Sequence, residues 1–206
     1  MAAEQERTEV RVEVDGRTLT LVNLEKVMYP RTGTTKGEVL HYYAQVAPRI
    51  LPVLADRAVT RIRWPHGTGE QSFFEKNVPG GTPSWVRTVR VPTTGSRTAS
   101  KEAGTLEFPV VDSLATLTWL VNLAALELHV PQWRIPRRAR KPRTDTLVFD
   151  LDPGPPATIA ECCEVAVALR GLLEEDGFTA FPKTSGSKGM QVSAPVDVAD
   201  PDLPSK

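Results

Sequence analysis

Near the N-terminus, apolar and polar residues alternate along the chain. Every second residue is apolar from Val10 to Val14 and from Leu19 to Leu21, and Asp15-Gly16 separates the two runs. This spacing predicts a β-hairpin with one buried face. Asn23 is then predicted to cap a short helix that Pro30 ends.

Helical periodicity follows in three later segments, where apolar residues recur every three or four positions. The predicted N-caps of these helices are Thr35, Ser113 and Thr158. The second helix is predicted to run through Leu126. The third has Glu161 three residues after its cap, which makes a capping box, and Gly177 is predicted to end it.

Shorter apolar runs predict strands between and after the helices. They cover residues 58–64, 72–74, 128–130 and 146–149, and a strand-turn-strand spans residues 179–195. Since strands and helices alternate irregularly and no segment repeats, we expect an α+β fold, with mixed, largely antiparallel sheets flanked by helices. A chain of 206 residues has room for one such domain or two small ones.

Composition and charge exclude some classes of protein. The chain is 40% hydrophobic and 24% charged, which excludes disorder throughout, and it has no apolar run long enough to span a membrane. Its two cysteines are adjacent and form neither a disulfide framework nor a zinc site, which favours the cytoplasm. Residues 1–144 hold 21 Lys and Arg against 14 Asp and Glu, whereas residues 145–206 hold 4 against 11. The basic part could bind a polyanion, unless folding mixes the two parts in space.

The segment Leu147–Gly154 is the first candidate for chemistry. An apolar strand ends at Asp150 and Asp152, and their i, i+2 spacing puts both carboxylates on one face at the strand's end. Two such ligands suit one or two divalent cations, as phosphoryl transfer requires. The alternative is a charged strand end that precedes a Pro-Gly turn.

The segment Thr184–Gly189 is the second candidate. Its two glycines allow the backbone to approach a phosphate, and its hydroxyls, N–H groups and Lys188 could bind one. The spacing is not that of a Walker A loop. A plain surface hairpin turn is the alternative interpretation.

Three further features each have a structural and a functional interpretation. His129 stands between apolar neighbours and is either a core residue or a site residue. Six cations between Arg134 and Arg143 form either a solvated loop or contacts to phosphates. Phe73 and Phe74 either belong to the core or stack on an unpaired base.

Together with Asn23–Pro30, these segments resemble the polymerase domain of bacterial DNA ligase D, in that family's motif order. That domain belongs to the archaeo-eukaryotic primase superfamily and serves non-homologous end joining. The resemblance begins near residue 17, so residues 1–16 are interpreted as an N-terminal extension of one primase-polymerase-like domain, residues 1–206. It implies template-directed nucleotidyl transfer, namely gap filling and end extension at DNA double-strand breaks, with a preference for ribonucleotides.

The resemblance also implies roles for residues of the candidate site. Asp150 and Asp152 would be the catalytic carboxylates and would hold Mn²⁺ or Mg²⁺ against the nucleotide. His129, Ser185 and Lys188 would bind the nucleoside triphosphate, with the histidine beside the other two in one pocket.

Four residues would bind DNA under the same resemblance. Lys26 and Lys36 would grip the 5′-phosphate of a downstream strand at a gap or break, and Phe73 and Phe74 would stack on the template. The loop at residues 92–105 would take the position of the family's end-bridging loop. The expected partners are DNA ends and gapped duplex, a ligase and the Ku end-binding protein, at the nucleoid in the cytoplasm and without a membrane.

The chain departs from the family's pattern near its C-terminus. The family carries a third metal-binding carboxylate and further arginines well downstream of Gly189, where only 17 residues follow here. The domain is therefore interpreted as cut short, with no strand to place Asp197, Asp200 or Asp202 as a substitute. Gln191 stands where relatives often have His. We expect a chain that binds DNA ends better than it polymerises, and a catalytically incomplete end-binding module is the alternative.

A haloacid-dehalogenase-like phosphatase is a more remote alternative. Residues 148–152 resemble the strand that carries that family's aspartyl nucleophile. The family usually has Gly-Thr after the second aspartate and a further acidic motif far downstream. This chain has Pro153-Gly154 there and 54 residues after Asp152, which disfavours the phosphatase.

Overall fold

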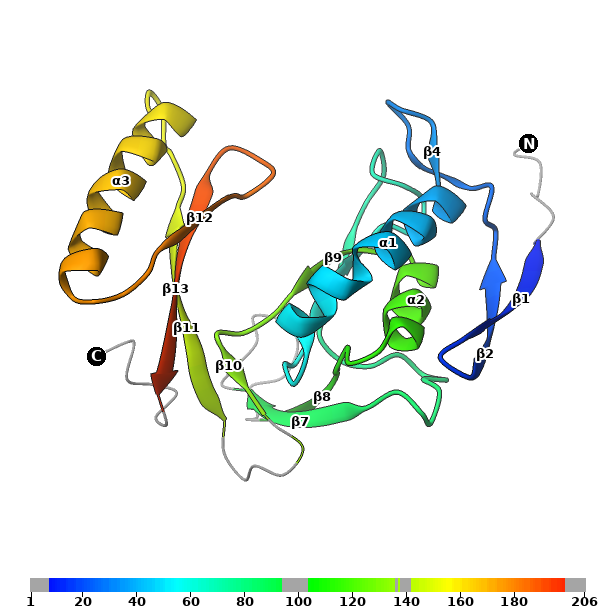
Figure 1. Ribbon diagram of the computed structural model, residues 1–206. Helices are drawn as coiled ribbons and strands as arrows, with labels where there is room; N and C mark the ends of the chain where they lie inside the picture. Colours follow the sequence, from blue (N-terminus) through cyan, green and yellow to red (C-terminus); the bar gives the residue numbers. More distant parts are fainter. Residues whose placement is uncertain (1–7, 94–103, 136, 138–141, 199–206) are drawn as a thin grey trace. The chain divides into compact units, whose positions relative to one another are not determined.

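The computed structural model describes residues 8–93, 104–135, 137 and 142–198. Contacts divide the chain into two compact units, Met1–Pro131 and Gln132–Lys206, and each is described by itself (Figure 1). Both units combine antiparallel strands with helices, which confirms the expected α+β class. No helix among the described residues is long and apolar enough to cross a membrane.

Unit 1 combines two helices with short antiparallel strands in its described part. The helices are α1 (Lys36–Leu54) and α2 (Leu114–Asn122). The strands are β1 (Glu9–Val14), β2 (Arg17–Val22), β3 (Val27–Tyr29), β4 (Thr34–Thr35), β5 (Thr60–Arg63), β6 (Phe73–Glu75), β7 (Thr88–Thr93), β8 (Gly104–Pro109) and β9 (Ala125–His129). They pair as β1-β2, β3-β4 and β7-β8 and as a three-stranded sheet of order β6-β5-β9.

Helix α1 begins where the sequence predicts. The backbone N–H of Thr35 donates to Glu38 Oε2 at 2.7 Å, and the N–H of Glu38 donates to Thr35 Oγ1 at 3.3 Å. This reciprocal cap satisfies two donors that a helix start leaves unpaired, and it lowers the pKa of Glu38 by hydrogen bonding to the charged form. The capping prediction is confirmed.

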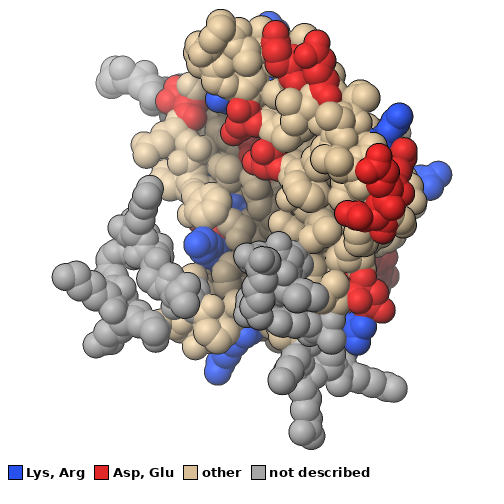
Figure 2. Space-filling model, turned by 90° about the vertical axis from the view of Figure 1, so that its left-hand side faces the viewer, with Lys and Arg blue, Asp and Glu red and all other residues tan. Residues whose placement is uncertain are grey.

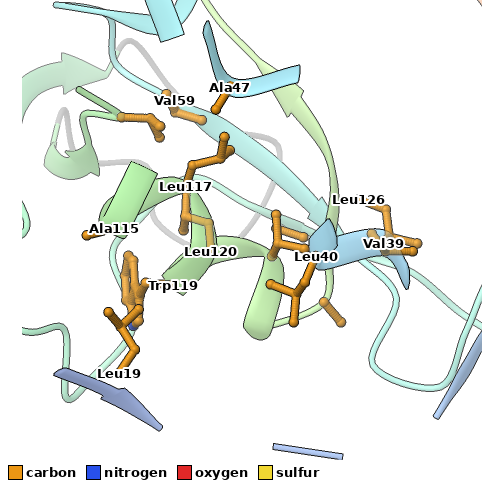
Figure 3. Packing of buried hydrophobic residues seen from close by; sticks show 14 of the residues in the cluster. Leu19, Val39, Leu40, Ala47, Val59, Ala115, Leu117, Trp119, Leu120 and Leu126 are labelled. Carbon is orange, nitrogen blue, oxygen red and sulfur yellow. The ribbon is translucent and has the colours of Figure 1, made fainter. Parts of the chain in front are cut away.

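The core of unit 1 forms where the apolar faces of α1 and α2 meet (Figure 3). Leu117 and Leu120 of α2 have no exposed surface, and Val39 and Leu40 of α1 are buried in the same cluster. Leu19 of β2 is part of it as well, so the predicted hairpin forms and packs on α2. Each leucine buried in this way contributes about 1.5–3 kcal/mol relative to an exposed position.

Several elements of unit 1 differ from the predictions, among them the strand predicted at residues 128–130, which is β9 (Ala125–His129). Residues 24–30 form a turn and β3, not a helix, because Asn23 has a positive φ of 54° and closes the first hairpin. Its side chain accepts the N–H of Thr8 at 3.2 Å. Helix α2 ends at Asn122, not Leu126, because Ala124 has a φ of 62° and turns the chain into β9.

Unit 2 consists of an antiparallel sheet with one helix packed on it in the described part (Figure 1). The elements are β10 (Trp133–Arg134), β11 (Arg143–Leu151), α3 (Ile159–Glu175), β12 (Phe181–Thr184) and β13 (Met190–Val198). The order of the strands is β10-β11-β13-β12, so β12 lies at an edge, and all four of its side chains are exposed. Thr158 and Glu161 form the predicted capping box, and Gly177 follows the helix end with a φ of 84°.

Candidate active site

The two predicted carboxylates lie together at the end of β11. Leu147, Phe149 and Leu151 pack against the buried cluster that α3 forms with β13. Because side chains alternate along a strand, Asp150 and Asp152 project from the opposite face, and both are exposed. The spacing therefore places both carboxylates on one face, as predicted.

The turn between β12 and β13 has an internal bonding pattern that Ser185 organises. The N–H of Ser185 donates to the carbonyl oxygen of Gly189 at 3.0 Å. Ser185 Oγ accepts the N–H groups of Ser187 at 3.3 Å and Gly189 at 3.2 Å. With its oxygen accepting two bonds, the hydroxyl keeps its own proton to donate outward. A phosphate oxygen is a suitable acceptor for that proton.

Gly189 brings this turn into direct contact with the end of β11. A Cβ built on Gly189 would lie 2.9 Å from Asp152 Oδ1 and closer still to the carbonyl oxygen of Leu151. Only glycine fits such an approach, so packing against β11 requires a glycine at position 189, and the expected approach of its backbone to a phosphate stays a prediction. Gly186, with a φ of 83°, supplies the left-handed residue that the turn needs.

Lys188 adds a positive charge next to the carboxylates. Its Nζ lies 3.4 Å from the carbonyl oxygen of Pro153, the residue that follows Asp152. Neither Asp150 nor Asp152 accepts a hydrogen bond or pairs with a cation from the residues that the structure describes. Two unpaired carboxylates repel each other, and a bound divalent cation would remove that repulsion.

The acidic character of the C-terminal part is retained on the surface of unit 2. Figure 2 looks onto the side where α3 lies and shows more acidic than basic surface. The exposed acids of α3 are Glu161, Glu164, Glu174 and Glu175. A polyanion would be repelled from this side of the unit.

No third metal ligand joins the pair in the described part of the chain, where no group of three or more His, Cys, Asp or Glu side chains could hold an ion. Asp197 is placed by a strand, β13, and the expectation that no strand positions it is wrong. It pairs with Arg143 at the other end of the sheet. Gln191 lies opposite Asp150, and six residues of strand put Asp197 about 20 Å away. Asp200 and Asp202 lie outside the described residues.

His129 belongs to unit 1, at the end of β9. It is 52% exposed, and its Nε2 lies 3.1 Å from Glu127 Oε2. The core interpretation of this histidine is wrong, because an exposed imidazole beside a carboxylate is a surface group. Its role beside Ser185 and Lys188 stays a prediction.

Lys26 and Lys36 come together in unit 1, ten residues apart in sequence. The backbone N–H of Lys36 donates to the carbonyl oxygen of Lys26 at 2.8 Å. Lys26 is half-buried, whereas the Lys36 side chain is buried and its Nζ donates to the carbonyl oxygen of Val22 at 2.7 Å. Of the two, Lys26 has the side chain that solvent and a ligand can reach without a rearrangement.

Phe73 and Phe74 lie on β6, an edge strand of the three-stranded sheet. They are 47% and 61% exposed, so the core interpretation is wrong and both rings are accessible for stacking. Lys76 Nζ lies 5.7 Å from the centroid of the Phe74 ring, a cation–π contact.

Sequence reasoning missed the ion pairs that hold this aromatic strand in place. Glu75 of β6 contacts Arg61 Nη2 at 2.8 Å and Arg63 Nη1 at 2.7 Å, both from β5. Arg61 has no exposed surface, and its Nη2 also donates to the carbonyl oxygen of Asn77 at 2.7 Å. The alternation of charged and apolar residues in β5 was the signal for these contacts.

Two predicted features fall wholly or partly outside the described residues. Residues 94–103 of the predicted end-bridging loop lie outside them, as do three members of the arginine-rich segment. The described ends of that loop, residues 92–93 and 104–105, are paired strand residues of β7 and β8, so the predicted loop bounds are too wide. Of the cations that are described, Arg134 pairs with Asp145 and Arg143 with Asp197, while Arg137 is exposed. Neither feature is therefore part of the candidate site in the described residues.

Unpaired strand-end carboxylates beside a turn with a lysine and a free hydroxyl proton have the composition of a metal-dependent nucleotidyl-transfer site. Comparison with known proteins agrees with that class. The chain belongs to the family described as LigD, primase-polymerase domain, whose model matches residues 35–203. This membership leaves no support for the phosphatase alternative.

The relatives of this chain are larger end-joining proteins. It is 42% identical over 184 residues to the multifunctional non-homologous end joining DNA repair protein LigD of Mycobacterium tuberculosis, covering 87% of this chain and 23% of the relative. The bifunctional LigD of Bacillus subtilis is 36% identical over 178 residues, which cover 86% and 26%. The chain therefore spans about a quarter of these relatives.

A solved structure shares the fold. It is the polymerase domain from Mycobacterium tuberculosis ligase D in complex with DNA, which superposes with a TM-score of 0.78 at 42% identity. The match covers 87% of this chain and 62% of that one. The expected primase-polymerase-like fold is confirmed.

Proposed function

We propose that this chain carries out template-directed nucleotidyl transfer at DNA ends in non-homologous end joining. The observation that carries the proposal is the contact of Gly189 with Leu151 and Asp152, which brings the turn of Ser185 and Lys188 to the strand end that carries the two carboxylates. Family membership supports it, as do relatives that are named for end joining and a solved relative in complex with DNA.

Asp150 and Asp152 would hold Mn²⁺ or Mg²⁺. Both are hard oxygen ligands, exposed on one face and free of competing cations in the described residues, so they fit such an ion. A divalent cation held there would neutralise charge on the phosphates of a nucleotide and on the attacking oxygen. The two carboxylates would fix the position of that cation, so we expect replacement of either one by an amide to lower the activity.

Ser185 and Lys188 would bind the phosphates of the incoming nucleotide. The Ser185 hydroxyl has its proton left to donate, and the Lys188 ammonium is exposed beside the end of β11. His129, whose Nε2 lies 3.1 Å from Glu127 Oε2, would contact the same phosphates.

Lys26 would bind the 5′-phosphate of a downstream strand, and Phe73 and Phe74 would stack on the template. Lys36 could contact the same phosphate only by exchanging its bond to Val22. Recognition of a phosphate and of base faces is independent of sequence, as the repair of arbitrary breaks requires. We extend the proposal to a ribonucleotide preference and to action with a ligase and a Ku protein at the nucleoid.

Primer extension on a gapped duplex tests the proposal. The duplex carries a 5′-phosphate or a 5′-hydroxyl at the gap, and the reaction contains Mn²⁺ or Mg²⁺ with ribonucleotides or deoxyribonucleotides. We expect extension that Asp150→Asn and Asp152→Asn each reduce by at least about 100-fold, the loss expected when positioned charge is removed. Asp176→Asn, an exposed acid at the end of α3, is the control.

The outcomes separate the activities. If the wild type extends the primer and the Asp150 and Asp152 variants retain that activity, the proposed site is wrong. If the wild type binds the phosphorylated gap but adds no nucleotide under any condition, the chain is an end-binding module. Equal extension of phosphorylated and hydroxylated gaps would refute the 5′-phosphate role of Lys26.

A further inference from the structure

A pocket lies in unit 1, lined only by residues of that unit. Its volume is about 520 Å³, and three tyrosines contribute to its wall. The lining residues are Tyr29, Thr32, Thr34, Glu38, Val39, Tyr42, Tyr43 and Leu126. They come from β3, the turn after it, β4, the N-terminal half of α1 and the start of β9, and the proposed function assigns them no role.

The tyrosines divide into one anchored ring and two accessible rings. Tyr43 donates its hydroxyl proton to the carbonyl oxygen of Leu126 at 2.8 Å and is half-buried. Tyr42 is 58% exposed and Tyr29 38% exposed. The rings of Tyr42 and Tyr43 meet edge to face at a centroid distance of 5.5 Å, so the anchored ring supports the exposed one.

The remaining lining disfavours a phosphate and suits an uncharged ring with polar edges. Glu38 brings a carboxylate to the pocket, and the charge of Glu127 is near enough to raise the pKa of Tyr29, although burial is the larger cause. The hydroxyls of Thr32 and Thr34 hydrogen-bond to each other at 2.7 Å and can exchange that bond for one to a ligand. A nucleobase offers π faces for the tyrosines and edge donors for oxygens of this kind.

The pocket adjoins the residue proposed to bind the 5′-phosphate. Lys26 directly precedes β3, and Tyr29 is the last residue of that strand, so the two Cα atoms lie at most about 10 Å apart along the chain. On the other side, Lys36 donates its backbone N–H to Lys26, and Glu38 lies two residues further along the chain. Phosphate site and pocket are therefore neighbours on one β-hairpin and one helix start.

We propose that the tyrosine pocket binds the base of an unpaired nucleotide next to the 5′-phosphate that Lys26 holds. This inference rests on the proposed function, because Lys26 sets which nucleotide reaches the pocket. Tyr42 and Tyr29 stack on the base, and the hydroxyls and Glu38 accept hydrogen bonds from its edge. A frayed or unpaired 5′-nucleotide at a break is then held by both its phosphate and its base.

Equilibrium binding of the full chain to a gapped duplex tests the inference. The unpaired nucleotide that carries the 5′-phosphate is either intact or abasic, and fluorescence anisotropy gives Kd for both. We expect the wild type to bind the intact form about tenfold more tightly, within the range of a stacked base. Tyr42→Phe keeps that ratio because it keeps the ring, whereas Tyr42→Leu lowers it to below about twofold. Val53→Ala, at an exposed residue of α1 outside the pocket, keeps it.

A Tyr42→Leu protein that still discriminates the intact from the abasic form about tenfold overturns the inference. Because Tyr42 is mostly exposed, the variant is expected to fold, and circular dichroism checks this. The same duplexes with a 5′-hydroxyl, bound by wild type and by Lys26→Ala, test the phosphate site separately. If Lys26→Ala removes a phosphate preference while Tyr42→Leu changes nothing, the pocket inference alone fails. If the wild type shows no phosphate preference, the role of Lys26 fails and the inference with it.

Discussion

Replacing Gly189 with alanine adds one methyl group between the β12–β13 turn and the end of β11 that carries Asp150 and Asp152. The new Cβ would meet Asp152 Oδ1 at 2.9 Å and the carbonyl oxygen of Leu151 at a still shorter distance. The carboxylate can rotate away, but the carbonyl belongs to the backbone of a paired strand. The turn must therefore move as a whole, and Ser185 and Lys188 move with it.

The size of the movement follows from the contact distances. The favourable separation of non-bonded carbon and oxygen atoms is about 3.5 Å. Relief of the contact with Asp152 alone therefore requires a displacement of about 0.6 Å, and relief of the contact with Leu151 requires a larger one. A displacement of about 1 Å in a catalytic arrangement costs on the order of 100-fold in rate. Overpacking of this kind also destabilises a fold by about 1–3 kcal/mol.

Single-turnover primer extension, Mn²⁺ titration and thermal unfolding measure the three consequences. We expect Gly189→Ala to lower the rate about 100-fold, to weaken Mn²⁺ binding and to lower the Tm. Gly154→Ala is the matched control, because a Cβ there meets nothing within 4 Å. Gly189→Ala with the rate, Mn²⁺ affinity and Tm of the control would refute the close approach on which the site is built.

Three further predictions concern stability. Burial raises the pKa of Tyr43 to about 12, so from about pH 10 upward only the unfolded chain loses this proton. The free energy of unfolding of the wild type should therefore fall by about 2–3 kcal/mol relative to that of Tyr43→Phe by about pH 12. A difference between the two proteins in urea unfolding that stays constant with pH would contradict this. Arg61→Leu leaves Glu75 with one of its two cations and should lower the free energy of unfolding by about 3 kcal/mol. The double variant Arg61→Leu/Glu75→Gln should lose less stability than Arg61→Leu alone. Equal losses in the single and the double variant would show that the pair is not coupled. Thr158→Ala removes the N-cap of α3 and should cost about 1 kcal/mol in urea unfolding, whereas Thr179→Ala, outside any helix, should not.

Local chemistry explains which elements could be predicted from the sequence. Both capping boxes consist of residues three positions apart, so Thr35 and Thr158 mark helix starts without any knowledge of the fold. Asn23 and Ala124 were misjudged because each adopts a positive φ to meet a partner distant in sequence or to enter a strand. From the sequence alone, an asparagine that caps a helix cannot be distinguished from one that closes a hairpin.

In the candidate site, too, local spacing predicts some features and contacts between distant segments determine others. The i, i+2 spacing of Asp150 and Asp152 predicts a shared face, since a strand alternates its side chains. That Gly189 closes on Leu151 depends on the antiparallel pairing of β13 with β11, which spacing alone does not reveal. The tyrosine pocket was missed for a related reason, because Tyr29 and Tyr42 belong to different elements that meet only after folding.

The edge strand β12 has a consequence for self-association. An open strand edge offers its backbone to any extended chain, and sheets grow in this way when proteins aggregate. Pro182 stands in the middle of this edge opposite Val192 and has no N–H to offer. A strand added along β12 would lack that bond, so Pro182 protects the hairpin that carries Ser185 from intermolecular pairing.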